Sequence, residues 1–364
     1  MRRFPASVLR EQVATVLRTW NMPTDTATRT AEIVVDADLL GIDSHGISML
    51  PLYESKLTSG GLRLDTTAEV VHDDGSAVVV IDGAAGLGHV VAADAMQMAC
   101  DRAARFGIGL AVVRNSHHFG AAGYYARLAA DQGKLGLVTT STHTLSQAPT
   151  GGAERRLGTN PIAFAAPAER HPPVVLDMAT TVVAANKVKT YALADRDLPA
   201  EWVIDGRGSP VHDSHAALNI LSNQQEGGGL LPVGGLGTVT GGHKGYGLAM
   251  MVEILSCALS GAGQQDAGPS DNIGHMLLAI DPAAFGAPTR TARYVDSLID
   301  FIHETTPLDP ATPVLVPGEP EVRTLSERST SGIPLASTLI AQVREICRRH
   351  GASFLLDAPV DPPT

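Results

Sequence analysis

Apolar residues recur at three- and four-residue spacing along several segments of the chain, a pattern typical of helices that bury one face. In residues 7–20 these positions are Val8, Leu9, Val13, Val16, Leu17 and Trp20. A second such segment, residues 24–41, ends at Gly41, a residue type that commonly stops helices. The same spacing predicts further helices over residues 89–107, 120–133, 243–261, 291–306 and 336–351.

Short apolar runs bounded by polar or glycine-rich stretches predict strands. They cover residues 76–83, 108–115, 134–142, 161–167, 173–181 and 275–286, the last with a turn. Because predicted strands and helices alternate between residues 76 and 142, the pattern favours an α/β fold. Residues 205–242, rich in glycine and polar side chains, are expected to form a loop, and the tail 357–364 is expected to be disordered.

Composition narrows the class of protein. The chain has 364 residues, of which 44% are hydrophobic, so it can bury a substantial core. The net charge of −11 disfavours nucleic acid and anionic membranes as partners. No apolar stretch is long enough to span a membrane, and the charged start does not resemble a signal peptide. The three cysteines are far apart, which is typical of free thiols in a reducing cytoplasm.

Two polar clusters carry the candidate chemistry. The stretch GIDSHGISMLPLYE (41–54) holds Ser44 and His45 just after a predicted helix. The stretch VVRNSHHFGAAGYYARLA (112–129) holds Ser116, His117 and His118 at the carboxyl end of a predicted strand. Open α/β sheets bind ligands at that edge, so we expect both clusters to face a cleft.

The residue types in these clusters favour proton transfer over other chemistry. Aspartate, serine and histidine that are neighbours in sequence cannot form a hydrolase relay, and the chain has no GxSxG motif. The histidines show no metal-ligand spacing, so we expect no metal site. Histidine is the side chain that passes a proton most readily near neutral pH, which leaves general acid–base catalysis.

Two glycine-rich stretches invite comparison with phosphate-binding loops. IDGAAGLGHVV (81–91) connects a predicted strand to a helix, but its glycine spacing is not GxGxxG, so a tight turn is favoured over a Rossmann loop. GGHKGYG (241–247) opens a predicted helix and adds the charge of Lys244. That stretch is either a phosphate site or a flexible entry to the helix.

Six motifs, in this order, give the chain a family resemblance: DSHG, NSHHFGAAGYYA, LGTNPIAFAAP, VVLDMATT, LLPVGG and HKGYGLAMMVEILSCALSG. Together they resemble the malate/L-lactate dehydrogenase type 2 family, whose members are NAD(P)-dependent 2-hydroxyacid and imino-acid oxidoreductases without a Rossmann domain. The resemblance implies an α/β fold with a mixed-sheet cofactor domain (76–289) and a helical domain (1–75 with 290–364) for substrate binding and dimerisation. It further implies a cytoplasmic homodimer that uses NADH or NADPH.

The resemblance also implies roles for individual residues. We expect His118 to be the acid/base, with His45 and Ser44 as its catalytic partners and Met49, Tyr53 and His117 in the substrate pocket. The expected cofactor contacts are Asp177, Met178, Ala179, Thr180, His243, Lys244, Gly245, Pro317, Gly318 and Glu319.

One departure from the family pattern concerns the substrate. Many members read SHGxxR, and that arginine clamps the substrate carboxylate, whereas this chain has Met49. A subgroup resembling the bacterial hydroxycarboxylate dehydrogenases shares SHGxxM and the stretches AIDPAAFGAP and VLVPGE. Methionine lines apolar pockets, so we expect reduction of a bulky or aromatic 2-oxo acid, and the reverse oxidation. The carboxylate anchor is open among Arg114, Arg155, Arg156 and backbone N–H groups.

Three alternatives remain. The chain is also compatible with a reductase of cyclic ketimines such as piperideine or pyrroline carboxylate, or with a malate- or lactate-type dehydrogenase. A catalytically idle binding protein is disfavoured because His45, His118 and Lys244 are all present.

Overall fold

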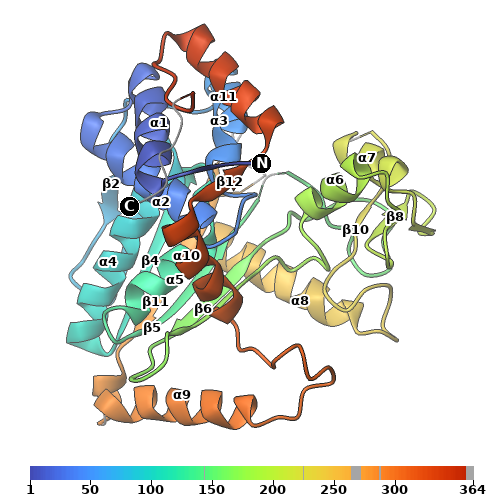
Figure 1. Ribbon diagram of the computed structural model, residues 1–364. Coiled ribbons are helices and arrows are strands. Elements are labelled where there is room, and N and C mark those ends of the chain that lie inside the picture. The colour runs from blue at the N-terminus through green and yellow to red at the C-terminus, as the bar shows by residue number, and fades with distance from the viewer. Residues whose placement is uncertain (143, 224, 264–271, 287, 358–364) are drawn as a thin grey trace.

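A mixed α/β fold is seen in the computed structural model, which describes residues 1–142, 144–223, 225–263, 272–286 and 288–357 (Figure 1). Within these residues seven strands form the main sheet, in the order β2-β3-β4-β11-β5-β6-β7. Their bounds are Glu69–His72, Val78–Gly86, Ile108–Ser116, Ile273–Ile280, Leu135–Thr140, Ile162–Ala166 and Val174–Met178. Only β3 and β4 pair in parallel; the other neighbours are antiparallel. The predicted α/β class is confirmed.

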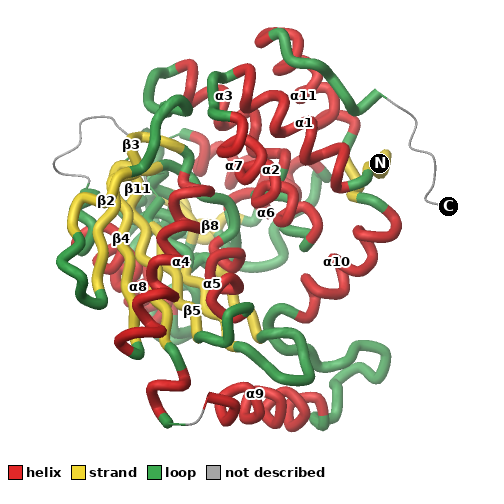
Figure 2. Tube along the Cα trace, turned by 90° about the vertical axis from the view of Figure 1, so that its left-hand side faces the viewer, coloured by secondary structure: helices red, strands yellow, loops and turns green. Residues whose placement is uncertain are grey.

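Two helices, α4 (Gly88–Phe106) and α5 (Ala122–Ala130), pack on the sheet. Alternate strand residues face them, as the two-residue period of a strand requires; these are Val79, Ile81, Ala111, Val113, Leu277 and Ala279. Alanines of both helices fill the same apolar cluster, so helix and sheet approach closely. The stretch IDGAAGLGHVV (81–91) lies within the parallel unit β3-α4-β4, where it joins β3 to α4, which fits the predicted tight turn between strand and helix. Figure 2 shows α4 and α5 lying over the strands.

The two ends of the chain form a second body. Strand β1 (Arg2–Phe4) pairs with β12 (Ile333–Leu335), and one apolar cluster combines helices from both ends. These helices are α1 (Ala6–Thr19), α2 (Thr24–Leu39), α3 (Leu50–Thr58) and α11 (Ser337–His350). Figure 1 shows α1, α3 and α11 side by side, in blue and red. The predicted domain boundaries themselves stay a prediction.

A small lobe contradicts the predicted loop over residues 205–242. It contains α6 (Ala185–Leu193), α7 (Ser214–Ser222) and a sheet of β8 (Val203–Asp205), β9 (Pro210–Val211) and β10 (Gly228–Leu230). Figure 1 shows it projecting beside α8. The high glycine content masked two local features: the Asp213 side chain caps α7 by accepting from Ala216 N–H at 2.6 Å, and Ala217 and Ile220 bury one helix face.

Most other predicted elements are present with shifted ends. The predicted helix 243–261 is α8 (Gly242–Glu253) continued by a π-helical turn, Ile254–Ala258, and the predicted helix 291–306 is α9 (Pro288–His303). Helix α10 (Glu319–Ser331) was not predicted, because its sequence is mostly polar and buries no residue fully. The predicted disorder of the tail falls on residues 358–364, outside the described residues, apart from position 357.

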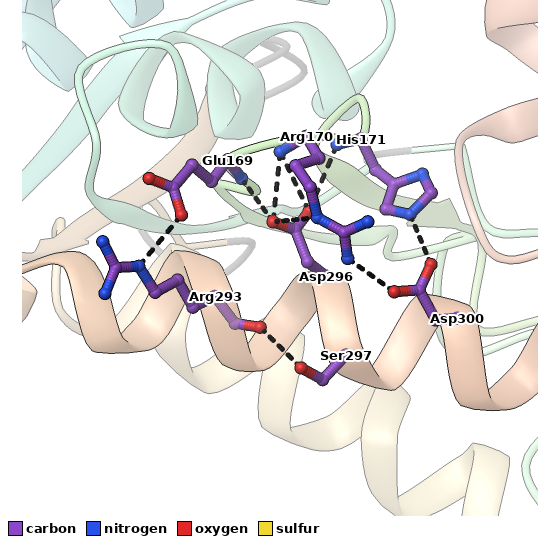
Figure 3. A network of polar contacts seen from close by, with 7 residues as sticks. All are labelled: Glu169, Arg170, His171, Arg293, Asp296, Ser297 and Asp300. Carbon is purple, nitrogen blue, oxygen red and sulfur yellow. Dashed lines mark hydrogen bonds and ion pairs between the residues drawn. The ribbon is translucent and has the colours of Figure 1, made fainter.

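Helix α9 holds the connection between β6 and β7 (Figure 3). The Asp296 carboxylate, which is buried, accepts from three consecutive backbone N–H groups, those of Glu169, Arg170 and His171, at 3.1–3.3 Å. Burial raises the pKa of Asp296, but the three N–H donors outweigh it and the pKa lies below its ordinary value. Asp300 adds ion pairs to Arg170 and to His171, the latter at 2.8 Å.

A buried carboxyl fixes the turn that contains the SHG motif. The Asp38 side chain, near the end of α2, accepts from Ile47 N–H at 2.8 Å, and a Cβ at Gly46 would lie 1.8 Å from its Oδ1. Only glycine therefore fits at that position. Arg328 of α10 donates to the Asp38 carbonyl and pairs with the Asp43 carboxylate. Burial raises the pKa of Asp38 to about 8, so the side chain is neutral near pH 7.

Replacing Asp296 with alanine is expected to destabilise the fold by about 2–4 kcal/mol, because three N–H groups lose their acceptor at once. Urea unfolding at neutral pH measures the change. The matched control is Ser297→Ala on the exposed side of the same helix, expected within about 0.5 kcal/mol of wild type. Equal stability of the two variants would contradict the role given to Asp296.

Replacing Asp38 with asparagine is expected to flatten the pH dependence of stability. The folded chain keeps a proton on Asp38 that the unfolded chain releases above its ordinary pKa of about 4. The stability from Asp38 is therefore fully present below about pH 4 and is lost as pH rises toward about 8. Urea unfolding at several pH values should show wild type losing more stability than Asp38→Asn over this range; parallel curves would refute the neutral carboxyl.

Candidate active site

The structure brings the two predicted histidines together. His45 lies in the turn after α2, and His118 lies two residues beyond the end of β4. Their rings stack, with centroids 5.4 Å apart and planes inclined by 22°. Both side chains are half-buried, so each ring is held by protein on one side and open on another.

Each ring has one nitrogen held and one open. The Ser44 hydroxyl lies 2.7 Å from His45 Nδ1, and the Tyr53 hydroxyl lies 2.8 Å from His118 Nδ1. Gly120 N–H also donates to His118 Nδ1, at 3.3 Å. Neither Nε2 has a hydrogen-bond partner within the described part of the chain. Each of the two stacked rings thus keeps one nitrogen, Nε2, for a ligand.

The surroundings keep both rings neutral near pH 7. Burial lowers the pKa of His118 well below 6.5, and the neighbouring rings of His45, His89 and His275 lower it further. Burial also lowers the pKa of His45. A neutral imidazole can accept a proton from an alcohol, and an anionic ligand beside the pair would favour the protonated form.

Two side chains behind His118 are deeply buried. Tyr53 is only 2% exposed, so it contacts the His118 ring from the protein side. His89 of α4 is fully buried, with Nε2 3.4 Å from the Tyr53 hydroxyl. The sequence reading missed His89, although it lies on the buried stripe of its helix with Ala92 and Met96. A histidine on such a stripe is the signal that could have found it.

His117 and Met49 have other contacts. His117 Nε2 lies 2.7 Å from the carbonyl oxygen of Gly61, so this ring points away from His118, as neighbouring side chains do in extended backbone. Met49 is half-buried and packs against the apolar cluster of the chain ends. Their predicted roles in the substrate pocket stay predictions.

The three predicted cofactor segments converge at β7. Val175 N–H donates to the carbonyl of Pro317 at 3.0 Å, which fixes the loop of residues 317–319 beside the strand. Val233 N–H donates to the Thr180 carbonyl at 2.9 Å, and the Val233 carbonyl accepts from Gly245 N–H at 3.2 Å. Residues 177–180 and 243–245 are therefore connected through a single residue.

The segment 118–123 joins the histidine pair to these cofactor segments. Gly120 N–H contacts His118, and three residues later Gly123 N–H donates to Asp177 Oδ2 at 2.7 Å. The Thr180 hydroxyl is used internally, because it donates to the carbonyls of Thr159 and Asn160. Asp177 is exposed, and Met178 and Ala179 are half-buried, so this strip borders solvent.

The start of α8 fits an anionic group. His243 and Lys244 are exposed there, after Gly241 in the left-handed region. The N–H groups of Lys244 and Gly245 already donate to the carbonyls of Gly241 and Val233, so only the N–H groups before them are candidates for a ligand. An ammonium group, an imidazole and helix N–H groups are the donors that suit a phosphate. The residues present therefore fit a phosphate-bearing nicotinamide cofactor.

The candidate carboxylate anchors are engaged elsewhere. Arg155 is buried in the lobe, where it donates to the carbonyls of Ile220, Asn223 and Glu226. Arg156 pairs with Glu154, and Arg114 lies 3.5 Å from the Asp82 carboxylate. Backbone N–H groups and the open ring nitrogens are the donors that remain.

The described residues contain neither a cluster of metal ligands nor a membrane-spanning helix. No group of three or more His, Cys, Asp or Glu side chains in them is arranged to hold a metal ion. No helix built from them is long and apolar enough to cross a membrane.

Known proteins resemble this chain over nearly its whole length. The sequence profile of the malate/L-lactate dehydrogenase family matches residues 4–344. The chain is 36% identical to malate dehydrogenase of Pyrococcus abyssi over 358 residues, which cover 97% of this chain and 96% of that protein. It is 33% identical to hydroxycarboxylate dehydrogenase B of Escherichia coli K12 over 356 residues, covering 96% and 94%.

Solved structures support the same family relationship. The crystal structure of malate dehydrogenase from Entamoeba histolytica superposes with a TM-score of 0.90 at 28% identity, covering 97% of this chain and 99% of that one. Delta1-piperideine-2-carboxylate reductase from Pseudomonas syringae superposes with a TM-score of 0.80 at 28% identity, covering 95% and 100%. The chain belongs to the malate/L-lactate dehydrogenase family of oxidoreductases.

Proposed function

We propose that this protein reduces a 2-oxo acid to the 2-hydroxy acid with NADH or NADPH, and catalyses the reverse oxidation. One observation carries the proposal: two stacked histidines with open Nε2 atoms lie one short segment away from three converging cofactor segments. Proton source and hydride source are then adjacent, as the reaction needs.

His118 is the proposed acid and base. During reduction, negative charge grows on the substrate oxygen, and protonated His118 gives that oxygen its Nε2 proton. During oxidation, neutral His118 takes the hydroxyl proton at the same nitrogen. Ser44 holds the His45 ring by its Nδ1, so that His45 Nε2 contacts the same oxygen. The bound nicotinamide supplies or accepts the hydride.

The cofactor would be held by three segments. Lys244, His243 and the N–H groups at the start of α8 would bind its phosphates. The strip Asp177–Thr180 and the loop Pro317–Glu319 would contact the remainder, because both border β7.

The substrate is proposed to be bulkier and less polar than malate. Met49 stands where many family members have a carboxylate-binding arginine, and its side chain joins an apolar cluster. The substrate's own carboxylate would then bind backbone N–H groups. The chain resembles the hydroxycarboxylate dehydrogenases at this motif, and one of them is among its relatives.

A second candidate function is reduction of a cyclic ketimine carboxylate. The similarity in structure to delta1-piperideine-2-carboxylate reductase favours it. A C=N bond is reduced by the same hydride step, but its basic nitrogen needs less help from His118. A malate- or lactate-type substrate is the third candidate, since malate dehydrogenases are among the relatives.

A panel of substrates should separate these candidates. We expect oxidation of NADH or NADPH with phenylpyruvate and hydroxyphenylpyruvate, at higher kcat/KM than with pyruvate or oxaloacetate. The His118→Ala variant should lose about 10²–10⁴-fold in kcat, the usual worth of a general acid. Loss of nicotinamide absorbance at 340 nm measures both.

Each other outcome of the panel is informative. Turnover confined to piperideine-2-carboxylate would replace the main candidate by the second, and preference for oxaloacetate would replace it by the third. Full activity of His118→Ala would remove His118 from the mechanism. Cofactor fluorescence measured with that variant checks that the cofactor segments are intact.

We further propose a cytoplasmic homodimer. Free, buried cysteines at 100, 257 and 347 suit a reducing compartment. Exposed apolar side chains gather on α8 and its π turn; they are Leu248, Met250, Met251, Ile254 and Leu259. Such a face on one helix is typical of a subunit contact, and it would set Lys244 near the boundary between subunits.

Replacing Ile254, 54% exposed, with glutamate is expected to convert the dimer to monomer, because a charge would be buried without a partner. Light scattering after size exclusion measures the mass. The matched control is Phe301→Glu on α9, where an exposed apolar residue lies away from the proposed contact. A monomeric control and a dimeric Ile254→Glu would move the contact to α9.

A further inference from the structure

The proposed mechanism makes no use of His89, although this side chain is fully buried beside the site. Its Nε2 lies 3.4 Å from the Tyr53 hydroxyl, and that hydroxyl lies 2.8 Å from His118 Nδ1. The other ring nitrogen of His89, Nδ1, is buried and has no hydrogen-bond partner among the residues that the structure describes. The three side chains thus form a line that starts inside the protein and ends at the proposed acid.

A tyrosine hydroxyl carries one proton, so this line has two arrangements. In the first, His89 Nε2–H donates to the Tyr53 oxygen and the Tyr53 hydroxyl donates to His118 Nδ1. In the second, His118 Nδ1–H donates to the Tyr53 oxygen and the Tyr53 hydroxyl donates to His89 Nε2. The first leaves the proton of neutral His118 on Nε2; the second leaves it on Nδ1.

The resting protein favours the first arrangement. Gly120 N–H points at His118 Nδ1, which therefore acts as an acceptor. The unpartnered His89 Nδ1 is then a bare lone pair, which costs less than an unpaired buried N–H.

Protonated His118 requires the second arrangement, and so does neutral His118 when its bare Nε2 takes the hydroxyl proton. Both nitrogens of the protonated ring carry protons, and Nδ1–H needs the Tyr53 oxygen as acceptor. The Tyr53 hydroxyl must turn toward His89 Nε2, which accepts only if His89 is neutral and protonated on Nδ1. Without His89 the Tyr53 hydroxyl would have no second acceptor. Its proton would then keep pointing at the Nδ1–H of His118.

We propose that His89 is a positioning residue that acts through Tyr53: by accepting the Tyr53 hydroxyl proton in a hydrogen bond, it allows His118 to hold the proton that it delivers to the substrate. This inference rests on the proposed function, because it assigns a purpose to the protonated state of His118. Conversion of the first arrangement into the second moves the proton of each neutral ring from Nε2 to Nδ1 by exchange with solvent. In the second arrangement the catalytic proton enters and leaves His118 at Nε2, and the protons of Tyr53 and His89 stay in place.

The surroundings of the line support a neutral His89. Burial, together with a smaller effect of the neighbouring His45 ring, lowers the pKa of His89 to about 3. His89 is also the second residue of α4, where the positive end of the helix dipole disfavours a cation. The titratable groups that face His118 are Tyr53 of α3, His89 of α4, His45 of the SHG turn and His275 of β11.

Two variants of His89 test the proposal. Leucine removes the acceptor at similar volume, whereas glutamine keeps an acceptor oxygen. Reduction needs protonated His118, so the rate falls as pH rises through the pKa of that residue. For His89→Leu we expect this fall about one pH unit lower than in wild type, hence about tenfold slower reduction on the falling limb. His89→Gln should restore the profile, and the KM for cofactor should not change in either variant.

A measurement without substrate separates this inference from the proposed function. The ¹⁵N resonances of the His118 ring report its tautomer and pKa in the unliganded protein. His89→Leu should lower that pKa and His89→Gln should not. Where leucine prevents folding, Tyr53→Phe serves instead, with the same expected shift.

An unchanged His118 pKa and pH profile in both His89→Leu and Tyr53→Phe would overturn the inference, even if wild type turns over 2-oxo acids. A lowered His118 pKa in a protein that turns over no member of the panel would support the line of hydrogen bonds while refuting the proposed function.

Discussion

The hydrogen bond between the Tyr53 hydroxyl and His118 joins the two largest apolar cores of this protein. Tyr53 belongs to the cluster built from both chain ends, whereas His118 follows the last residue of a strand in the main sheet. Each core fixes the position of one of the two histidines. The stacking of His45 on His118, with ring centroids 5.4 Å apart, therefore depends on how the two cores pack against each other. A shift of either core would separate the rings, so the chemistry depends on that packing.

The sequence predicted the parts that depend on local pattern. The spacing of apolar residues, every second residue in strands and every third or fourth in helices, identified most strands of the main sheet and the helices packed on it. The order of the motifs identified the family. The motif residues His45, His118, Ser44 and Tyr53 do meet in space. Local pattern was sufficient for Ser44, His45 and His118 because they lie just beyond elements with a strong apolar stripe, whereas Tyr53 lies within α3, a helix that the pattern did not predict.

Features that depend on distant partners were out of reach. In the sequence, Asp38 looks like an ordinary aspartate of a helix. Its role depends on Gly46 and Ile47, which pack against its side chain, and on Arg328, which comes from the other end of the chain. The lobe was missed because its strands are short and rich in glycine, and its stability comes from Trp202, Ile220 and their neighbours rather than from propensity. His89 was expected only as the first residue of the predicted helix 89–107. Its significance lies in a hydroxyl 36 residues away in the chain.

The pairing of β1 with β12 has a consequence for how the chain is made. Residues 2–4 find their partners only at residues 333–335, so the helices that carry His45 cannot complete their core until almost the whole polypeptide has left the ribosome. The sheet, by contrast, draws its strands from residues 69–280 and can condense earlier. During synthesis the apolar faces of the amino-terminal helices therefore stay exposed until the carboxyl-terminal residues are made. This protein is most prone to aggregate in that interval, and less so once it is fully folded.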